Sequence, residues 1–357
     1  MRSKIAEIQY LRALAVLLVI IGHTHQAQGQ FFGEYLLGDW AFFGFAGVDV
    51  FFVISGFIIH ALYGERRLRP VQFILHRFNR IFPLYWFVTA VAMAGSLLLL
   101  GNELSAVVDR LDVGTVLLWP TGELPYLAVG WTLTHELYFY AAYIGFLSLP
   151  DRVRWWVAGV WATSGLILHV VSITPDMPLL RLMFSPFNLL FFAGVSIVPL
   201  MRRQTAARWR VLAVAVTLVG GAIAIAYTAS HGLAGLTDPV IRVSVFAPFA
   251  VGVVLLALEL KPRLPQLAAW LGDWSYSAYL IHSLVVTTLA ILLAPRIGHL
   301  TGDGGLFFLA AISASVGASA ILHLMIEQPA LKWGKRLVDG VLSAIRSEDV
   351  NDKKAEE

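Results

Sequence analysis

Ten stretches of about 20 apolar residues follow one another along this chain, and they constrain its fold more than any other feature. A helix needs about 20 apolar residues to cross the hydrocarbon core of a bilayer. The stretches cover residues 8–28, 43–63, 82–101, 127–148, 153–174, 180–200, 210–229, 239–259, 272–294 and 305–326. The sequence therefore predicts an all-α fold, a polytopic membrane bundle of about ten transmembrane helices.

The composition supports a membrane protein and excludes several other classes. Hydrophobic residues make up 58% of the 357 residues and charged residues only 14%, whereas soluble domains carry about 25% charged residues. These values exclude a disordered chain, a coiled coil and an ordinary cytosolic enzyme. Because the chain has no cysteine, disulfides, thiolate metal sites and a cysteine nucleophile are excluded as well. The net charge of +3 is too small to indicate a nucleic-acid partner.

The positions of lysine and arginine predict the orientation of the bundle. The connections between the stretches alternate between basic and nearly uncharged, so that 21 Lys and Arg residues fall on one side and 3 on the other. Arg12 and Arg242 lie well inside the stretches and are counted on neither side. Because basic residues accumulate in the cytoplasm, both termini are expected there. If the number of spans were wrong by an odd number, this alternation would be lost.

The two ends of the chain need separate interpretations. The basic start and the small residues near position 28 resemble a signal peptide, but Arg12 and His23 lie within the same segment and favour a retained first helix. At the other end, apolar and basic residues alternate at helical spacing over 330–346, which is typical of an interfacial helix. We therefore expect a transmembrane domain over residues 1–329. Residues 330–357 are expected to form a cytoplasmic amphipathic helix and charged tail.

Arg12 and His23 form the first candidate pair of functional residues. Ionisable groups inside the hydrocarbon are costly and mark functional sites by default. The two residues are eleven positions apart, so a helix places them on one face, about 16 Å apart along its axis. One interpretation is a snorkelling arginine and a histidine bonded to a neighbouring helix. The other is an arginine that holds an anion and an imidazole that accepts a proton in the same cavity.

Two further segments supply candidates of opposite charge. Arg77 and Arg80 lie three residues apart at the cytoplasmic edge of the third stretch, on one side of a helix. They fit either plain positive-inside topology or a clamp for the phosphates of a cytoplasmic donor. Glu136 lies inside the fourth stretch without a basic neighbour at helical spacing. Its partner is expected on another helix, where it would orient His23 or meet an arginine.

Several other polar residues have roles that the sequence leaves open. Asp273 fits a helix N-cap at the start of the ninth stretch. The remaining residues fit packing as well as chemistry, and they are Asp49, Ser55, His135, His169, Asn188, His282, His323 and Glu327. Aromatic residues near the predicted outer ends, Trp40 and Trp119 among them, fit either sugar stacking or the interfacial aromatic belt. No metal-binding or phosphate-loop motif occurs, and no metal is expected.

Five segments of the chain together resemble the acyltransferase 3 family of integral membrane acyltransferases. They are YLRALAVLLVIIGH (10–23), GVDVFFVISGF (47–57), HRFNRIFPLYW (76–86), WTLTHELYFY (131–140), and GDWSYSAYLIHS (272–283) with the later IEQPALKWGKR (326–336). The resemblance extends over nearly the whole chain. This family includes bacterial acetylases of lipopolysaccharide O-antigen, exopolysaccharide and nodulation factors, and some antibiotic acylases.

The resemblance implies a function and assigns roles to the candidates. Such proteins transfer an acyl group from cytoplasmic acyl-coenzyme A to a hydroxyl of a glycan in the bacterial inner membrane. Their essential arginine and histidine correspond here to Arg12 and His23, their arginine motif to Arg77 and Arg80, and their glutamate to Glu136. The expected reaction is O-acetylation, with His23 as the base and the three arginines holding acetyl-coenzyme A. A transient acyl-histidine is an open alternative.

A second class of function stays open at this stage. Ten spans with buried histidine and glutamate also suit a transporter or flippase of a glycolipid or small anion, which would be expected to show inverted repeats. The expected partners of the enzyme are membrane lipids and a glycan or lipid-linked saccharide acceptor. The sequence does not identify the acceptor or the acyl group, and it is compatible with a homo-oligomer.

Overall fold

The computed structural model describes residues 6–33, 35–64, 69–171, 173, 175–202, 206–262, 264–297 and 303–355, and these residues form helices and connections without strands. The longer helices are α1 (Ala6–Phe32), α2 (Ala46–Tyr63), α3 (Pro70–Leu99), α6 (Trp131–Ser148), α7 (Asp151–Val170), α9 (Phe187–Arg202), α10 (Ala206–His231), α11 (Pro239–Leu260), α12 (Gln266–Ile297), α13 (Asp303–Leu322) and α14 (Gln328–Ala355). Short helical turns connect them: η1 (Asp39–Phe45), α4 (Leu104–Val108), α5 (Val113–Leu117), η2 (Ala128–Gly130), α8 (Pro178–Met183), η3 (Ala234–Leu236) and the π-helical η4 (His323–Glu327).

A polytopic helical bundle is confirmed, although the number of spans is not. Each of the ten predicted stretches coincides with a helix. Within the described residues, eight helical segments are long and apolar enough to cross a membrane. The two helices outside that set are α6 and α7. These two helices are consecutive. If neither crosses the membrane, the number of spans falls by two, and every later connection stays on the side that was predicted for it. Ten spans and two cytoplasmic termini stay predictions.

Two helices extend well beyond the stretches that predicted them. α3 begins at Pro70, a residue suited to the first turn of a helix, and not near position 82. α12 begins at Gln266, so Asp273 lies inside this helix and the predicted N-cap at that residue is wrong. In both cases the apolar run covers only part of the helix, and the helical backbone continues past it.

Close backbone contacts determine how the central helices pack. α2 contacts α9, and α1 contacts both α2 and α12. At the α2–α9 crossing, a Cβ on Gly56 would meet the carbonyl oxygen of Phe191, and a Cβ on Gly194 would meet that of Val53. Small residues at helix crossings are typical of membrane bundles because they let backbones approach closely. These glycines keep α2 in the centre of the bundle.

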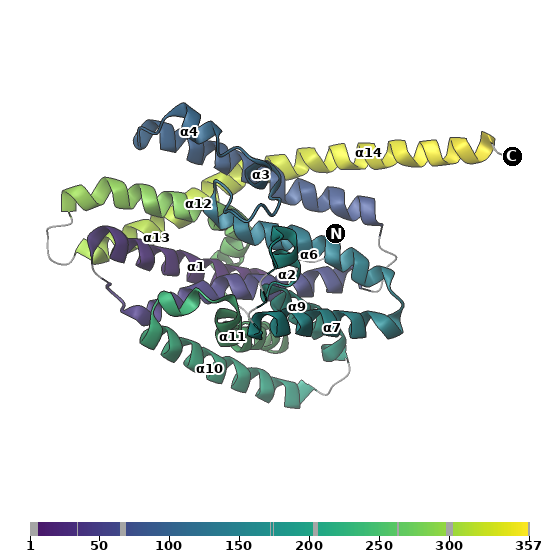
Figure 1. Cartoon of the computed structure of the whole chain (residues 1–357), viewed down its shortest axis with the longest axis horizontal. Helices are drawn as coiled ribbons and strands as arrows, with labels where there is room; N and C mark the ends of the chain where they lie inside the picture. Colours follow the sequence, from purple (N-terminus) through teal and green to yellow (C-terminus); the bar gives the residue numbers. More distant parts are fainter. Residues whose placement is uncertain are drawn as a thin grey trace.

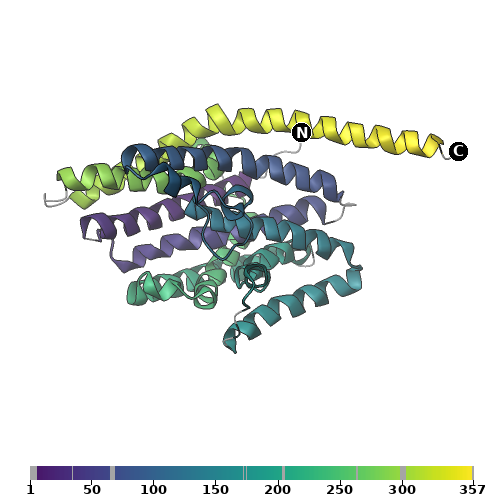
Figure 2. The same ribbon diagram turned by 45° about the horizontal axis from the view of Figure 1, so that its top comes forward.

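The arrangement of the helices places the predicted cytoplasmic ends together. The ends of α2 and α9 and the starts of α3 and α10 lie on the right in Figure 1. The opposite ends of α1 and α3 lie on the left, where α3 continues into α4. The helix α14 runs beside α3 and then extends past the bundle in both views (Figures 1 and 2). The predicted boundary between the transmembrane domain and the C-terminal segment, at residue 330, falls near the start of α14.

Candidate active site

A cavity of about 650 Å³ lies in the middle of the bundle and is lined by residues of α1, α2, α3, α6 and α12. We call it the large cavity. Its walls are mostly apolar, and its polar lining includes Arg12, Arg77, Arg80 and Glu136. The contributing parts are the first turns of α1, the first half of α3, most of the length of α2, the first half of α6 and the middle of α12. In the predicted topology the parts from α1 and α3 lie toward the cytoplasm, and those from α2 and α6 continue toward the outer half of the bundle.

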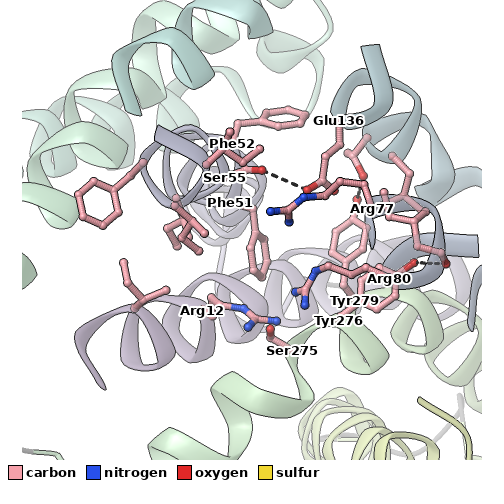
Figure 3. Close-up of a pocket in the computed structure, with 18 of the residues that line it drawn as sticks. Arg12, Phe51, Phe52, Ser55, Arg77, Arg80, Glu136, Ser275, Tyr276 and Tyr279 are labelled. Carbon is pink, nitrogen blue, oxygen red and sulfur yellow. Dashed lines mark hydrogen bonds between the residues drawn. The ribbon is translucent and has the colours of Figure 1, made fainter. Parts of the chain in front are cut away.

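Three arginine side chains share this cavity. Arg12 comes from α1, and Arg77 and Arg80 come from one face of α3 (Figure 3). The guanidinium of Arg77 lies 5.2 Å from the ring centroid of Tyr140 and 5.3 Å from that of Phe73. Arg12 donates to Gln9 Oε1 at 3.4 Å. The structure thus brings together three residues that the sequence singled out separately.

No carboxylate neutralises these arginines by direct pairing among the described residues. The ion pairs found there involve Arg154, His169, Arg242 and His323. Arg77 Nε is buried without a hydrogen-bond partner. A buried cation without a paired anion is costly. A cavity lined by three partly buried arginines outside these ion pairs is therefore suited to an anionic ligand.

Glu136 lies on α6 and faces the same cavity (Figure 3). Its Oε1 atom accepts a hydrogen bond from Ser55 Oγ at 3.1 Å and another from the Tyr140 hydroxyl. These partners lie on α2 and one turn further along α6. Neither is His23, so the expectation that Glu136 orients the His23 ring is not met in this structure. The two residues lie at different depths in the bundle, because Glu136 lies beside Arg77 whereas His23 lies beyond Tyr279.

His23 is not one of the residues that line the large cavity, but it lies close to the end of the cavity that Tyr279 forms. Its Nδ1 atom is 3.0 Å from the carbonyl oxygen of Val19. Because only an N–H can bond a carbonyl, Nδ1 carries a proton, and in the neutral ring the lone pair is therefore on Nε2. The ring centroid lies 4.7 Å from that of His282 and 4.9 Å from that of Phe45. In its neutral form His23 therefore offers Nε2 as a base.

His282 and Tyr279 connect His23 to the large cavity. His282 is fully buried, its Nδ1 is 3.1 Å from the Ala278 carbonyl oxygen, and its Nε2 has no hydrogen-bond partner. Its ring centroid is 5.7 Å from that of Tyr279, which lines the cavity. The Tyr279 hydroxyl is 2.8 Å from Thr132 Oγ1. The sequence contained this arrangement as GDWSYSAYLIHS, in which Tyr279 and His282 are three residues apart on one helix face.

A buried ion pair joins α2 to α11, and sequence reasoning did not predict it. Arg242 Nη2 lies 3.2 Å from Asp49 Oδ2, and the two side chains are 13% and 0% exposed. Arg242 also donates to the Phe45 carbonyl oxygen and lies over the rings of Trp131 and Phe187. The sequence did contain a feature that could have predicted this pair, since both charges fall inside predicted spans and each needs a partner.

The remaining polar candidates have structural partners. His135 bonds the Trp131 carbonyl oxygen through Nδ1 and Ser185 Oγ through Nε2. Asn188 donates to the Leu182 carbonyl oxygen at 3.0 Å. Outside the predicted spans, Asp238 accepts from the backbone N–H groups of Ile241 and Val240 and contacts His169. These contacts, with that of Ile241 first, lower the pKa of the Asp238 carboxyl below its ordinary value.

A polar cluster lies where α12 meets the π-helical turn before α14. Glu327 Oε2 accepts from Ser277 Oγ at 2.6 Å and contacts His323 Nδ1 at 2.7 Å. Gln328 also belongs to this cluster, because its Nε2 atom lies 3.0 Å from His323 Nε2. Since a π-helical turn widens the spacing of a helix, it allows His323 and Glu327 to point to the same place. The described residues contain no group of three or more histidine, aspartate or glutamate side chains arranged to hold a metal ion.

Comparison with known proteins decides the family. An acyltransferase domain, Acyl_transf_3, matches residues 5–324. The chain belongs to the acyltransferase 3 family. It is similar to the exopolysaccharide production protein ExoZ of Rhizobium meliloti, with 33% identity over 82% of this chain and 91% of the relative. It is also similar to the acyltransferase MdmB of Streptomyces mycarofaciens, with 27% identity over 90% of each chain.

Two further relatives extend the comparison. Nodulation protein 10 of Rhizobium leguminosarum bv. viciae is 27% identical over 93% of this chain and 95% of its own length. The peptidoglycan O-acetyltransferase OatA of Listeria monocytogenes is 33% identical over only 26% of this chain. No solved structure matches the chain. The protein is thus a multi-pass acyltransferase of the bacterial inner membrane, which decides against a transporter without acyl transfer.

Proposed function

We propose that this acyltransferase moves a short acyl group, acetyl before others, from cytoplasmic acyl-coenzyme A to a hydroxyl of a cell-surface or exported glycan. The relatives whose names mention exopolysaccharide and peptidoglycan O-acetylation support the glycan acceptor. A lipid-linked saccharide is an equally suitable form of that acceptor at a membrane. The large cavity supports the coenzyme A donor.

One observation carries the donor assignment, namely the three arginines that line one cavity without ion-pair partners among the described residues. Coenzyme A ends in phosphate groups, and guanidinium groups bind phosphate through charge-assisted hydrogen bonds. In our proposal Arg77 and Arg80 bind the phosphates, and Arg12 lies deeper along the pantetheine arm. The apolar walls, including Phe51 and Phe52, cover the rest of the arm.

The reacting end of the donor would then lie near Tyr279 and His282, on the side of His23. The acceptor hydroxyl attacks the thioester carbonyl, His23 Nε2 removes the hydroxyl proton, an oxygen–carbon bond forms and the carbon–sulfur bond breaks. The thiolate of coenzyme A leaves and takes up a proton. Glu136 is the second catalytic candidate, and its carboxylate acts within the large cavity rather than through the His23 ring. Direct transfer and a transient acyl-histidine both fit this arrangement.

The test uses the purified protein in lipid nanodiscs with acetyl-coenzyme A. Thiol release is followed with and without a glycan fraction extracted from the host envelope and medium. We expect His23→Ala to reduce glycan-dependent release by at least about 100-fold while donor binding persists. Arg80→Ala should weaken donor binding by about tenfold or more, because a charge-assisted hydrogen bond is lost.

The matched control is Arg110→Ala, because Arg110 lies over the Tyr126 ring on the predicted outer side, away from the large cavity. It should leave donor binding unchanged. Equal donor affinity in wild type and Arg80→Ala would contradict the assignment of the large cavity. Absence of both donor binding and thiol release with acetyl-, succinyl- and longer acyl-coenzyme A would overturn the proposed function.

A further inference from the structure

A second cavity, of about 300 Å³, lies at the opposite end of α6 from the cytoplasmic side, and we call it the small cavity. Its lining comes from the connection before α6 and from the starts of α8, α9 and α11. In the predicted topology, all of these segments lie at the outer face of the membrane. Nothing in the proposed donor site uses this cavity.

The residues of the small cavity have the chemistry of a saccharide site. Trp119 and Trp131 provide aromatic faces, and the exposed side chains of Glu123 and Arg181 provide an acceptor and donors of hydrogen bonds at the rim. Arg181 Nε donates to the Pro175 carbonyl oxygen at 2.7 Å, which holds its guanidinium in place. An amphipathic sugar ring binds to such a combination of flat apolar surface and directed polar groups.

Trp119 differs from other aromatic residues near the predicted outer ends of the helices. It is 55% exposed and lines a cavity. Phe42 is only 1% exposed and packs in the core, and Tyr126 lies under the guanidinium of Arg110. Trp40 is exposed but lines neither cavity. A residue of the lipid interface needs no cavity, so the position of Trp119 favours binding over membrane anchoring.

The first turn of α6 forms a wall between the two cavities. Thr132, Leu133 and Glu136 line the large cavity, whereas Trp131 and His135 line the small one. Both ring nitrogens of His135 have partners, so this histidine is part of the wall rather than a base. Residues on opposite faces of one turn therefore contact two separate ligand spaces.

His23 lines neither cavity, but chains of contacts lead from it to both. Toward the large cavity it contacts His282, which contacts Tyr279. Toward the small cavity it contacts Phe45, whose carbonyl oxygen accepts from Arg242, and Arg242 lies over Trp131 and Phe187 in the wall of the small cavity. Side-chain contacts thus connect the base of the proposed reaction to the proposed donor space and, through Phe45 and Arg242, to the outward-facing small cavity.

From this geometry we infer that the small cavity is a subsite for one pyranose ring of the glycan acceptor, with Trp119 as its stacking surface and Glu123 as a hydrogen-bond acceptor for its hydroxyls. The inference rests on the proposed function for the identity of the glycan as acceptor. It adds a location and two residues that determine acceptor affinity without acting on the donor.

The experiment separates acceptor binding from acyl transfer. Binding of fluorescently labelled oligosaccharides, released from the same host glycan fraction, is measured on the full-length protein in nanodiscs without donor. Trp119→Ala should weaken this binding about tenfold, and Trp119→Tyr should restore most of it because a ring remains. Glu123→Gln should weaken it less. Saturation by acetyl-coenzyme A should be the same in all variants.

The matched control is Trp156→Ala, because Trp156 is a 78% exposed tryptophan of α7 that lines neither cavity. It should bind the oligosaccharides as wild type does. Unchanged binding in Trp119→Ala, or no binding by wild type, would overturn the subsite. Binding that depends on Trp119 in a protein that releases no thiol would support the subsite and contradict the proposed acyl transfer. The two failures are therefore distinguishable.

Discussion

The arginines inside this bundle fall into two groups that solve the same electrostatic problem differently. Arg242 is paired with Asp49, bonded to a backbone carbonyl and covered by two aromatic rings. Arg12, Arg77 and Arg80 line an open cavity and take no part in the ion pairs found among the described residues. The difference teaches that a charge held in an ion pair supports the fold, whereas an excess of positive charge outside ion pairs indicates where an anionic ligand binds.

Removing the paired arginine should have the largest effect on stability. Arg242→Met leaves the fully buried Asp49 carboxylate without its partner, and we expect a loss of about 3 kcal/mol in the free energy of unfolding. The midpoint of thermal unfolding in detergent would show it. Adding Asp49→Leu should recover most of the loss, because both charges are then gone. A single variant as stable as wild type would break the distinction between the two groups.

Arg80→Ala tests the second group, the arginines that line the large cavity. Because Arg80 has no paired carboxylate among the described residues, its removal should weaken donor binding while the midpoint of unfolding stays near that of wild type. The same thermal measurement made with and without acetyl-coenzyme A would check this. A loss of stability as large as that of Arg242→Met would place Arg80 in the structural group.

Glu136→Gln sharpens the comparison within the large cavity. The amide oxygen can still accept hydrogen bonds from Ser55 and Tyr140, but the negative charge beside the arginines is lost. We expect acyl transfer to fall about 100-fold, as is typical when a catalytic carboxylate is removed, and donor binding not to weaken. Steady-state rates and donor affinity would be measured together. Nearly full activity would show that Glu136 acts through its hydrogen bonds alone.

The smallest effect is expected for a charged contact outside the hydrocarbon. Asp238 caps α11 and contacts His169, and Asp238→Ala should cost about 1 kcal/mol in stability. Because these contacts lower the pKa of Asp238, its contribution is complete at neutral pH. It should disappear as the pH falls below the ordinary value of 3.8 and through the lowered pKa. A stability difference that does not change with pH would contradict this origin.

Much of the site could be predicted because its residues are exceptions to their surroundings. Arg12, Arg77, Arg80 and Glu136 are charged residues in or beside apolar stretches, and the structure gathers all four around one cavity. The partners could not be predicted from spacing. Glu136 bonds Ser55 across 81 residues of chain, and Arg242 meets Asp49 across 193. Such contacts depend on which helices pack together, which a helical period does not encode.

The sequence by itself determined that the chain is a helical membrane protein with charges inside its helices, because hydrocarbon requires long apolar segments and makes every buried charge conspicuous. It also determined the family, through motifs spread along the chain. The tertiary structure alone decided where the helices begin, that α6 divides two cavities, and that His23 packs against His282 and Phe45. The physical reason is that a cavity belongs to the packing of several helices, while a sequence pattern describes one helix at a time.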